Sequence, residues 1–303
     1  ALPIYPAAGP DAHGASRWIA LGPITIQPSE LAKLTLVICA ATVLANRGDR
    51  IRDLASLWPL GVLVFGVVIV VMAQPDLGTT LVIVATIYLM TFVAGARMSH
   101  LGGAGLVGLV GGAGLIYSAS YRKERFLGFL HPWEDSSGRG YQLVQGLIAL
   151  GSGGLTGVGL GASRQKWLYV PNAHTDFIFA IIGEELGLIG TLIVVGLFAA
   201  FAWAGATIAM RTRDPFQRLL AAGATALIVG QAIVNLGAVM GILPLTGIPL
   251  PLISYGSSSR LVVLALVGML IAISREPQVL PSTPHPQAPE PRAPRRRRAA
   301  GGA

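Results

Sequence analysis

One carboxylate, Asp176, stands at the boundary between a polar loop and an apolar run. It lies in the stretch Tyr169–Leu188, which reads YVPNAHTDFIFAIIGEELGL, and the apolar residues 177–182 follow it directly. A carboxylate where the chain enters a bilayer can face water on one side and lipid on the other, which suits a general base that acts on a lipid-linked substrate. An Asp at the start of a helix is also a common N-cap, so both interpretations stay open at this point.

Small residues follow Asp176 at helical spacing. If a helix begins near Asp176, then Ala180, Gly183, Gly187 and Gly190 lie below it on the same face, because an α-helix has about 3.6 residues per turn. These residues predict a groove that runs down from the carboxylate. Close packing against a neighbouring helix is the more ordinary reason for such a stripe.

Glu30 and Lys33 form a second polar pair, one turn apart in an apolar segment that opens with Gln27 and Pro28. A Glu and a Lys at membrane depth are costly unless they pair with each other or face a polar cavity. The pair therefore predicts either a structural intramembrane ion pair or the lining of a polar cavity for substrate. The second interpretation makes Glu30 and Lys33 candidate substrate-binding residues.

The composition is that of an integral membrane protein. Of 303 residues, 53% are hydrophobic and only 12% are charged, whereas a soluble domain carries about 25% charged residues. The single Cys39 excludes a disulfide within the chain. The formal charge of +8 comes partly from the run Arg295–Arg298 near the end. Membrane lipids are expected partners, and a nucleic acid is not.

Apolar stretches long enough to cross a bilayer predict an all-α protein, a polytopic helix bundle with about seven transmembrane helices. The predicted spans are residues 28–46, 57–73, 77–96, 100–119, 177–210, 217–240 and 258–274. The span at 177–210 is too long for one perpendicular helix and is expected to tilt or to project beyond the bilayer. Residues 1–275 form the predicted transmembrane domain, and the Pro- and Arg-rich residues 276–303 are expected to be a disordered cytoplasmic tail.

The segments between the spans have distinct compositions. Residues 1–27 are rich in Pro, Gly and Ala and predict an extracytoplasmic loop, and Asp76 after Pro75 predicts a helix cap at a tight turn. The long polar stretch Tyr121–Thr175 predicts an ordered extracytoplasmic loop with short amphipathic helices. Leu243–Tyr255 predicts a Pro-broken re-entrant segment, which must be buried in protein or line a cavity.

Alternating spans place the Arg-bearing short loops at Asn46, Arg97 and Arg211 on the same side as the tail, which is therefore cytoplasmic. The long loop is then outside. It nevertheless carries six cations, which are Arg122, Lys123, Arg125, Arg139, Arg164 and Lys166.

These cations suit an anionic ligand at the outer surface. Arg matches the geometry of phosphate oxygens with paired donors, so a pyrophosphate would account for them. We expect Arg122, Arg125 and Lys166 to bind substrate. Salt bridges within the loop are the alternative, and the available acids are Glu124, Glu134 and Asp135.

Five blocks of sequence look like the motifs of one family, in the family's order. They are GASRWIALGPITIQPSELAKL, AQPDLGTTL, HPWEDSSGRGYQLVQGLIALGSGGLTGVGLG, PNAHTDFIFAIIGEELG and LPLISYGSSS. Together they cover roughly residues 11–275. The chain therefore resembles the SEDS family (shape, elongation, division and sporulation), and it looks most like its actinobacterial FtsW members.

The resemblance implies a ten-helix fold, so the first three helices are expected to be missing and the chain to begin in the loop before the fourth. It implies a peptidoglycan glycosyltransferase that polymerises lipid II during septal wall synthesis, with Asp176 as general base. His174, Ser257 and Ser258 complete the expected substrate-binding set. A divalent cation, Mg²⁺ or Mn²⁺, is the one cofactor to consider, although the sequence clusters no metal ligands.

The resemblance also implies a class B penicillin-binding protein, a transpeptidase, and other division proteins as partners in the bacterial cytoplasmic membrane. A lipid II flippase and a non-catalytic scaffold remain alternatives. Two positions depart from the family pattern: Ser257 stands where a second Gly is usual, and Leu168 stands where many FtsW sequences carry an acid.

Overall fold

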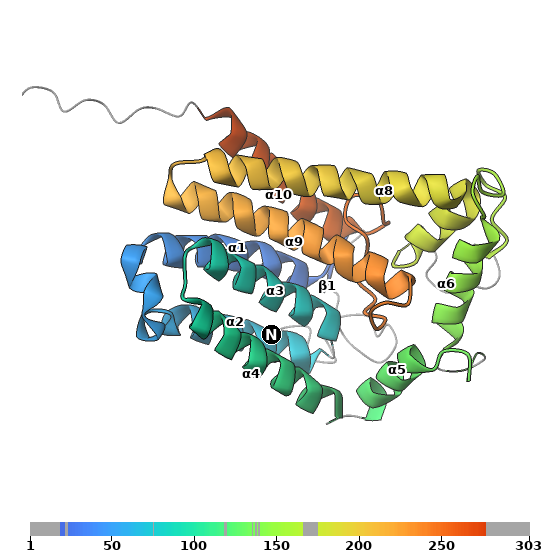
Figure 1. Cartoon of the computed structure of the whole chain (residues 1–303), viewed down its shortest axis with the longest axis horizontal. Helices are drawn as coiled ribbons and strands as arrows, with labels where there is room; N and C mark the ends of the chain where they lie inside the picture. The colour runs from blue at the N-terminus through green and yellow to red at the C-terminus, as the bar shows by residue number, and fades with distance from the viewer. Residues whose placement is uncertain are drawn as a thin grey trace, which may run out of the picture.

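The computed structural model describes residues 19–21, 24–74, 76–117, 120–134, 136, 138, 140–165 and 175–276. Long helices run back and forth side by side as one bundle (Figure 1). Their bounds are α1 Pro28–Ala45, α2 Trp58–Ala73, α3 Leu77–Val93, α4 Met98–Tyr117, α8 Ile178–Arg211, α9 Pro215–Val239 and α10 Ser257–Arg275.

The helices confirm the predicted polytopic bundle. Among the described helices, α1, α8, α9 and α10 are long and apolar enough to cross a membrane, and α2 and α3 are shorter apolar helices. The bounds of all seven helices follow the predicted spans closely. The largest disagreement is at the end of α3, which stops at Val93 instead of residue 96. The predicted tail lies outside the described residues from position 277 onward.

A short β-hairpin precedes α1, within the segment predicted as an extracytoplasmic loop. β1 (Ile19–Leu21) pairs antiparallel with β2 (Ile24–Ile26), with Ile19 opposite Ile26. Isoleucine and threonine favour extended backbone, and the intervening Gly-Pro dipeptide is turn-forming. β2 contacts α10, so the hairpin ties the beginning of the described chain to its last helix.

Capping residues and proline, which act through contacts close in sequence, determine where several helices begin. Asp76 caps α3, as predicted: its carboxylate accepts hydrogen bonds from the N–H and hydroxyl of Thr79 at 3.0 and 2.8 Å. Asp214 caps α9 by accepting from the N–H of Gln217 at 2.7 Å. Pro28 opens the first turn of α1, where a missing N–H costs nothing.

The central element of the bundle is α9. In its most apolar 18-residue window 78% of residues are buried, against 22% in α8 and 28% in α10. It packs against α8, α3, α1 and α10. The outer helices turn apolar side chains outward, as membrane helices do where they face lipid. Thr225, Gln231 and Asn235, the polar side chains beyond the first turn of α9, are therefore deep inside the protein.

The helix α8 is interrupted at Gly187, whose φ of 66° and ψ of −161° are not helical. A continuous helix over residues 178–211 would be about 51 Å long at 1.5 Å per residue, whereas residues 188–211 alone span about 36 Å. The second part is sufficient for a hydrocarbon core of about 30 Å. The segment predicted as one helix is therefore two helices that meet at Gly187, and whether it tilts or projects beyond the bilayer stays a prediction.

The chain that follows α6 (Tyr141–Ser152) fills this break. The N–H of Val158 donates to the carbonyl of Glu184 at 3.0 Å, and the N–H of Leu188 donates to the carbonyl of Gly154 at 2.9 Å. Backbone groups released from the helical ladder are thereby satisfied, as they must be near a membrane.

The same packing fills the predicted groove. A Cβ atom built on Gly183 would lie 2.4 Å from Leu150 Cδ2, and one built on Gly187 would lie 2.4 Å from the backbone nitrogen of Gly157. The small residues therefore serve close packing, and the open groove below Asp176 is not formed along them.

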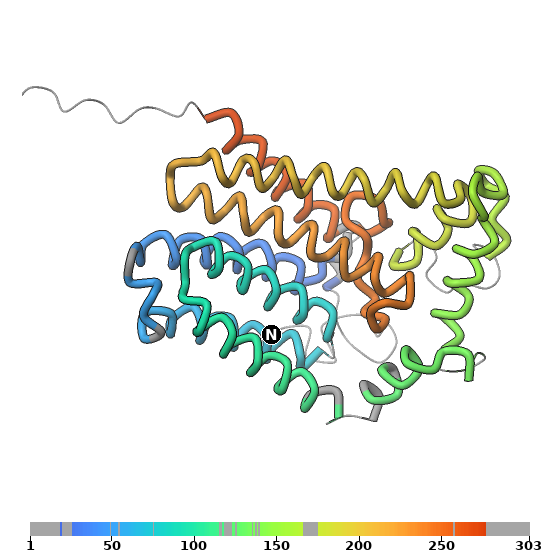
Figure 2. Tube along the Cα trace, viewed as in Figure 1, coloured from blue at the N-terminus to red at the C-terminus, as the bar shows by residue number. Residues whose placement is uncertain are grey.

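The long loop contains the predicted short helices, α5 (Ser120–Leu130) and α6, at the end of the bundle where α8 begins (Figure 2). Its described end is anchored by Glu184, which is 3% exposed. The Glu184 carboxylate accepts from the hydroxyl of Ser163 at 2.6 Å and from the N–H of Arg164 at 3.0 Å. The loop is therefore fixed to the helix that follows Asp176.

Candidate active site

Asp176 lies in a turn just before α8 and is partly buried. The N-cap of α8 is Phe177, so the interpretation of Asp176 as a helix cap is wrong. The Asp176 carboxylate accepts a hydrogen bond from the hydroxyl of Thr175 at 3.0 Å. Its peptide carbonyl accepts from Asn235 Nδ2 of α9 at 2.8 Å. The carboxylate is thus carried by a turn that α9 holds in place.

The chain between α9 and α10, residues 240–256, packs against this turn. A Cβ atom on Gly247 would lie 3.9 Å from Asp176 Oδ2, so the two are neighbours. The hydroxyl of Ser254 donates to the carbonyl of Thr175 at 2.5 Å and accepts from the N–H of Leu250 at 2.7 Å. This chain is the predicted re-entrant segment, and it lies against the carboxylate.

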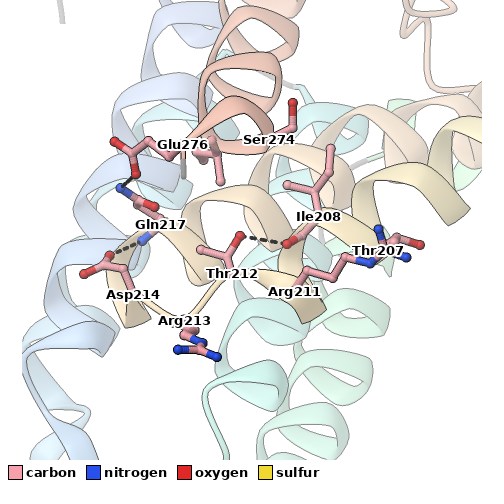
Figure 3. A pocket seen from close by; sticks show the side chains of 10 residues that line it. Thr207, Ile208, Arg211, Thr212, Arg213, Asp214, Gln217, Ser274 and Glu276 are labelled. Atoms are coloured by element: carbon pink, nitrogen blue, oxygen red, sulfur yellow. Dashed lines mark hydrogen bonds between the residues drawn. The ribbon is translucent and has the colours of Figure 1, made fainter. Parts of the chain in front are cut away.

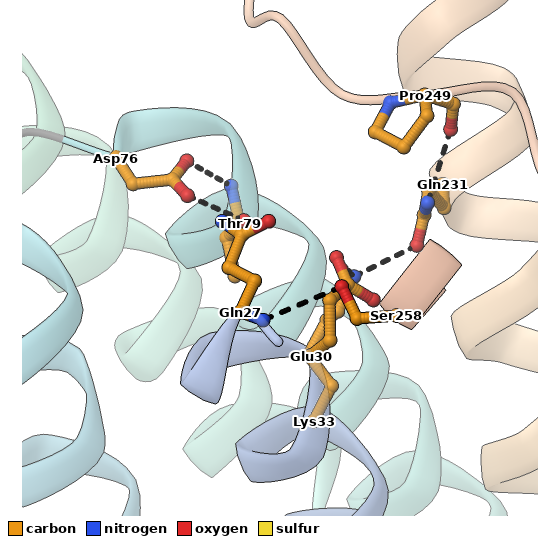
Figure 4. A network of polar contacts seen from close by, with 8 residues as sticks. All are labelled: Gln27, Glu30, Lys33, Asp76, Thr79, Gln231, Pro249 and Ser258. Atoms are coloured by element: carbon orange, nitrogen blue, oxygen red, sulfur yellow. Dashed lines mark hydrogen bonds and ion pairs between the residues drawn. The ribbon is translucent and has the colours of Figure 1, made fainter. Parts of the chain in front are cut away.

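Glu30 and Lys33 form the predicted ion pair, with 2.8 Å between Glu30 Oε1 and Lys33 Nζ (Figure 4). They are 3% and 2% exposed, so both charges are fully inside the protein. Lys33 Nζ also donates to Gln231 Oε1 at 3.0 Å. Gln231 Nε2 in turn donates to the carbonyl of Pro249 at 3.0 Å. The pair is therefore joined to the re-entrant segment through α9.

Glu30 also lines a small cavity, and its role in binding substrate stays a prediction. A cavity of about 100 Å³ is lined by Gln27, Glu30, Asp76, Thr79, Thr246, Gly247, Ile248 and Pro249. Within the described part of the chain, Glu30 Oε2 and Thr246 Oγ1 are buried without a hydrogen-bond partner. A cavity of this size holds a few water molecules or one hydroxyl-bearing group. Its wall includes Gly247, the neighbour of Asp176.

The predicted substrate-binding residues fall into two groups. Ser258 is 4% exposed, and its hydroxyl accepts from the N–H of Gln27 at 3.4 Å, beside the ion pair. Of the remaining predicted residues besides Glu30 and Lys33, Lys166 and His174 lie outside the described residues, as do the side chains of Arg122, Arg125 and Ser257.

Sequence reasoning did not assign Gln231, Asn235 and Ser254 to the site. The available signal was the presence of two amides four residues apart in a membrane span, because polar groups at that depth have partners or functions. What they bind could not be read from the sequence, since their partners lie on other elements.

Within the described chain, no three His, Cys, Asp or Glu side chains come together in a way that could hold a metal ion. The Glu30 carboxylate is engaged by Lys33 and that of Asp76 by Thr79. A divalent cation stays a prediction, and no step below is routed through one.

A larger pocket, of about 740 Å³, lies at the other end of the bundle (Figure 3). It is bordered by Arg211, Arg213, Asp214, Gln217 and Glu276. Gln217 contacts Glu276 there, and Asp214 caps α9. The 34-residue length of α8 separates this pocket from Asp176, so it takes no part in the candidate site.

A family model described as "Cell cycle protein", for FtsW, RodA and SpoVE, matches residues 1–279. The chain belongs to the FtsW/RodA/SpoVE family. It is 44% identical over 275 residues to stage V sporulation protein E of Bacillus subtilis (strain 168), covering 90% of this chain and 75% of that protein. It is 41% identical over 274 residues to the probable peptidoglycan glycosyltransferase FtsW of Geobacter sp. (strain M18), with the same coverage.

Solved structures agree with the family assignment. A chain in the structure described as "Structural coordination of polymerization and crosslinking by a peptidoglycan synthase complex" matches with a TM-score of 0.71 and 31% identity, over 89% of this chain and 76% of that one. The rod shape determining protein RodA of Thermus thermophilus matches with a TM-score of 0.62 and 31% identity, over 89% and 72%. The family and its membrane fold are confirmed, whereas the likeness to actinobacterial members stays a prediction.

Proposed function

We propose that this FtsW/RodA/SpoVE family protein is a peptidoglycan glycosyltransferase that polymerises lipid II into β-1,4-linked glycan strands. The observation that carries the proposal is the position of Asp176, a partly buried carboxylate at one end of a membrane bundle, beside the cavity wall at Gly247. Relatives about 40% identical to this chain, named as probable peptidoglycan glycosyltransferases, support it.

We propose that the reaction takes place at the outer membrane face, and the helix directions support this. The polar network lies at the starts of α1, α3, α8 and α10 and in the last turns of α9, which all share one end of the bundle (Figure 1). Cations mark the opposite end, at Arg47, Arg50, Arg52, Arg97, Arg211, Arg213, Arg218 and Arg275. Because Arg-rich short loops are cytoplasmic, the end with Asp176 is outside.

In the proposed reaction, the Asp176 carboxylate takes the proton from the 4-hydroxyl of the acceptor's GlcNAc. That oxygen attacks the anomeric carbon of the donor's MurNAc and forms the new glycosidic bond. The bond from this carbon to the undecaprenyl pyrophosphate breaks, and the pyrophosphate leaves with the electron pair. Attack from the side opposite the leaving group inverts the configuration.

Charge on the departing pyrophosphate needs cationic partners. We assign this role to Arg122, Arg125 and Lys166 of the extracytoplasmic loop, whose described helix α5 lies at the same end as the start of α8. His174, Ser257 and Ser258 are proposed to bind the sugars. A divalent cation carried by the pyrophosphate itself remains a proposal.

A class B penicillin-binding protein is the proposed partner, because a structural neighbour belongs to a complex that coordinates polymerization and crosslinking. Division-site localisation is proposed from the similarity to proteins named FtsW.

A lipid II flippase is the alternative that Glu30 and Lys33 would also suit. It needs a polar path through both leaflets, whereas the described polar network is confined to the outer end. The glycosyltransferase is therefore favoured.

The test is Asp176→Asn in the protein purified with its penicillin-binding partner, assayed by gel separation of glycan strands. The amide keeps the size of the side chain but cannot accept the proton, so polymer formation should fall to background while membrane insertion is unchanged. Asp214→Asn is the matched control, because Asn also caps helices and Asp214 lies at the cytoplasmic end. Near-normal polymer from Asp176→Asn would refute the assignment, and lipid II transport by the purified protein would favour the flippase.

A further inference from the structure

Two buried amide side chains, Gln231 and Asn235, lie one helical turn apart on α9, and each is 2% exposed. Gln231 Nε2 donates to the carbonyl of Pro249 at 3.0 Å, and Asn235 Nδ2 donates to the carbonyl of Ile248 at 2.7 Å. These two carbonyls are consecutive in the non-helical chain between α9 and α10. Backbone groups of such a chain need partners at membrane depth, so the amides hold it against α9.

Each amide also has a second partner, on a different element. Gln231 Oε1 accepts from Lys33 Nζ at 3.0 Å (Figure 4), and Asn235 Nδ2 donates to the carbonyl of Asp176 at 2.8 Å. The contacts therefore form one series. It begins at the Glu30–Lys33 ion pair, passes through Gln231, the 248–249 backbone and Asn235, and ends at Asp176.

We propose that Asn235 and Gln231 are positioning residues for glycosyl transfer, an inference that rests on the proposed role of Asp176 as general base. Asn235 fixes the turn that carries Asp176 relative to the 248–249 backbone. Gln231 fixes that backbone relative to the ion pair. Asn235 contacts the peptide carbonyl of Asp176, so it acts on where the carboxylate lies.

The geometry favours positioning over mere burial of polar groups. Both hydrogens of the Asn235 amide are used, and they join two carbonyls that are far apart in sequence. The adjacent carbonyl, that of Thr175, is held separately by the hydroxyl of Ser254. Two consecutive carbonyls of the turn are thus fixed from two directions, which leaves the backbone that carries the carboxylate little freedom to move.

Asn235→Leu should lower kcat roughly 100-fold, because a displacement of about 1 Å at a reacting group has an effect of that size. KM for lipid II should stay within about 2-fold, since no substrate contact is removed. The midpoint of the pH–rate profile should not move. Gln231→Leu should lower kcat less, because it acts on Asp176 only through the 248–249 backbone.

The measurements are kcat, KM and pH profile of lipid II polymerisation by the purified complex, together with hydrogen exchange of residues 243–255. Thr225→Val is the matched control: Thr225 is buried on the same helix, and its hydroxyl bonds only to the carbonyl of Ala221 at 2.8 Å in the described structure. If Asn235→Leu does not fold, Asn235→Ser and Ser254→Ala test the proposal instead. Each removes or weakens a hydrogen bond to the turn that carries Asp176, and each is a smaller change in side-chain volume. Asp176→Asn is assayed in parallel.

Three results for Asn235→Leu together would uphold the proposal. The kcat falls, the KM and the midpoint of the pH–rate profile stay the same, and hydrogen exchange in residues 243–255 becomes faster. The proposal is overturned if Asn235→Leu and Gln231→Leu have the same kcat as Thr225→Val. It is also overturned if the fall in kcat only matches the fall in the fraction of folded protein. An inactive Asp176→Asn beside a fully active Asn235→Leu refutes this inference alone. An active Asp176→Asn refutes the general base instead.

Discussion

Asn235 in α9 donates a side-chain hydrogen bond of 2.8 Å to the peptide carbonyl of Asp176, 59 residues earlier in the chain. The same nitrogen donates to the carbonyl of Ile248 at 2.7 Å. The place of the candidate base is therefore decided jointly by the central helix and by the chain that follows it. A substitution in α9 or in the chain that follows it should therefore displace the carboxylate without removing any of the carboxylate's own contacts.

The Glu30–Lys33 pair should be more sensitive to single than to double substitution. Glu30→Gln leaves the Lys33 ammonium buried without its counter-charge, and breaking a buried pair costs about 3–5 kcal/mol in soluble proteins. Lys33→Met should be worse still, because it also removes the donor to Gln231. The double variant Glu30→Gln/Lys33→Met should recover most of the stability, measured as the thermal unfolding midpoint in detergent.

Polymerisation by the same variants separates two roles of the pair. Thr35→Val on α1 is the control, because its exposed hydroxyl bonds only within its own helix among the described contacts. If the double variant is stable but polymerises as poorly as the single ones, the pair acts on substrate through the cavity at Glu30. If the double variant recovers both polymerisation activity and stability, the Glu30–Lys33 pair has a purely structural role.

Gly187→Ala should destabilise the protein by about 2–6 kcal/mol. The φ of 66° with ψ of −161° belongs to a region that is essentially restricted to glycine, which costs about 1–3 kcal/mol for another residue. The new Cβ atom would also lie 2.4 Å from the backbone nitrogen of Gly157, and overpacking adds about 1–3 kcal/mol. Thermal unfolding in detergent measures the loss.

Gly196→Ala on the same helix is the control for this change. Its Cβ atom meets nothing within 4 Å, and its backbone is helical. Alanine there should stabilise by about 0.5–1 kcal/mol, since glycine is the poorer helix former. Equal unfolding midpoints for the two variants would contradict the break at Gly187.

The spans were predictable because long apolar runs have few alternatives to membrane helices. The cap at Asp76 and the ion pair at Glu30–Lys33 were predictable for a similar reason: both depend on residues three positions apart. Local spacing decides such contacts.

The break at Gly187 and the role of Asn235 were not predictable in this way. A single Gly inside an apolar run is compatible with a continuous helix, and its true conformation depends on the chain at 153–159. The sequence shows Asn235 as an amide within a predicted span, but its partners come from two other segments. The small residues at 180, 183, 187 and 190 were ambiguous for the same reason. They are compatible both with an open groove and with a groove filled by another segment of the chain.

The cations of the long loop, which we propose to be extracytoplasmic, give the last prediction. Arg122 and Arg125 belong to α5, at the end of the bundle where α8 begins (Figure 1). Of the acids that might have paired with them, Glu134 has His131 Nδ1 at 3.4 Å as a partner. An excess of positive charge on the outer side opposes the bias that orients membrane proteins, so a ligand there should compensate for it.

Arg122→Gln, Arg125→Gln and Lys166→Gln should each weaken binding of lipid II, because a pyrophosphate beside lipid gains strongly from charged donors. Arg→Lys should also weaken it where the contact is bidentate, since Lys offers only a point charge. Binding is measured in nanodiscs at two salt concentrations, and the wild-type affinity should fall more steeply with salt than that of the variants. Arg213→Gln removes the same charge at the cytoplasmic end and should leave binding unchanged. Affinities equal to wild type for all three loop variants would show that the loop's charge serves folding or a protein partner.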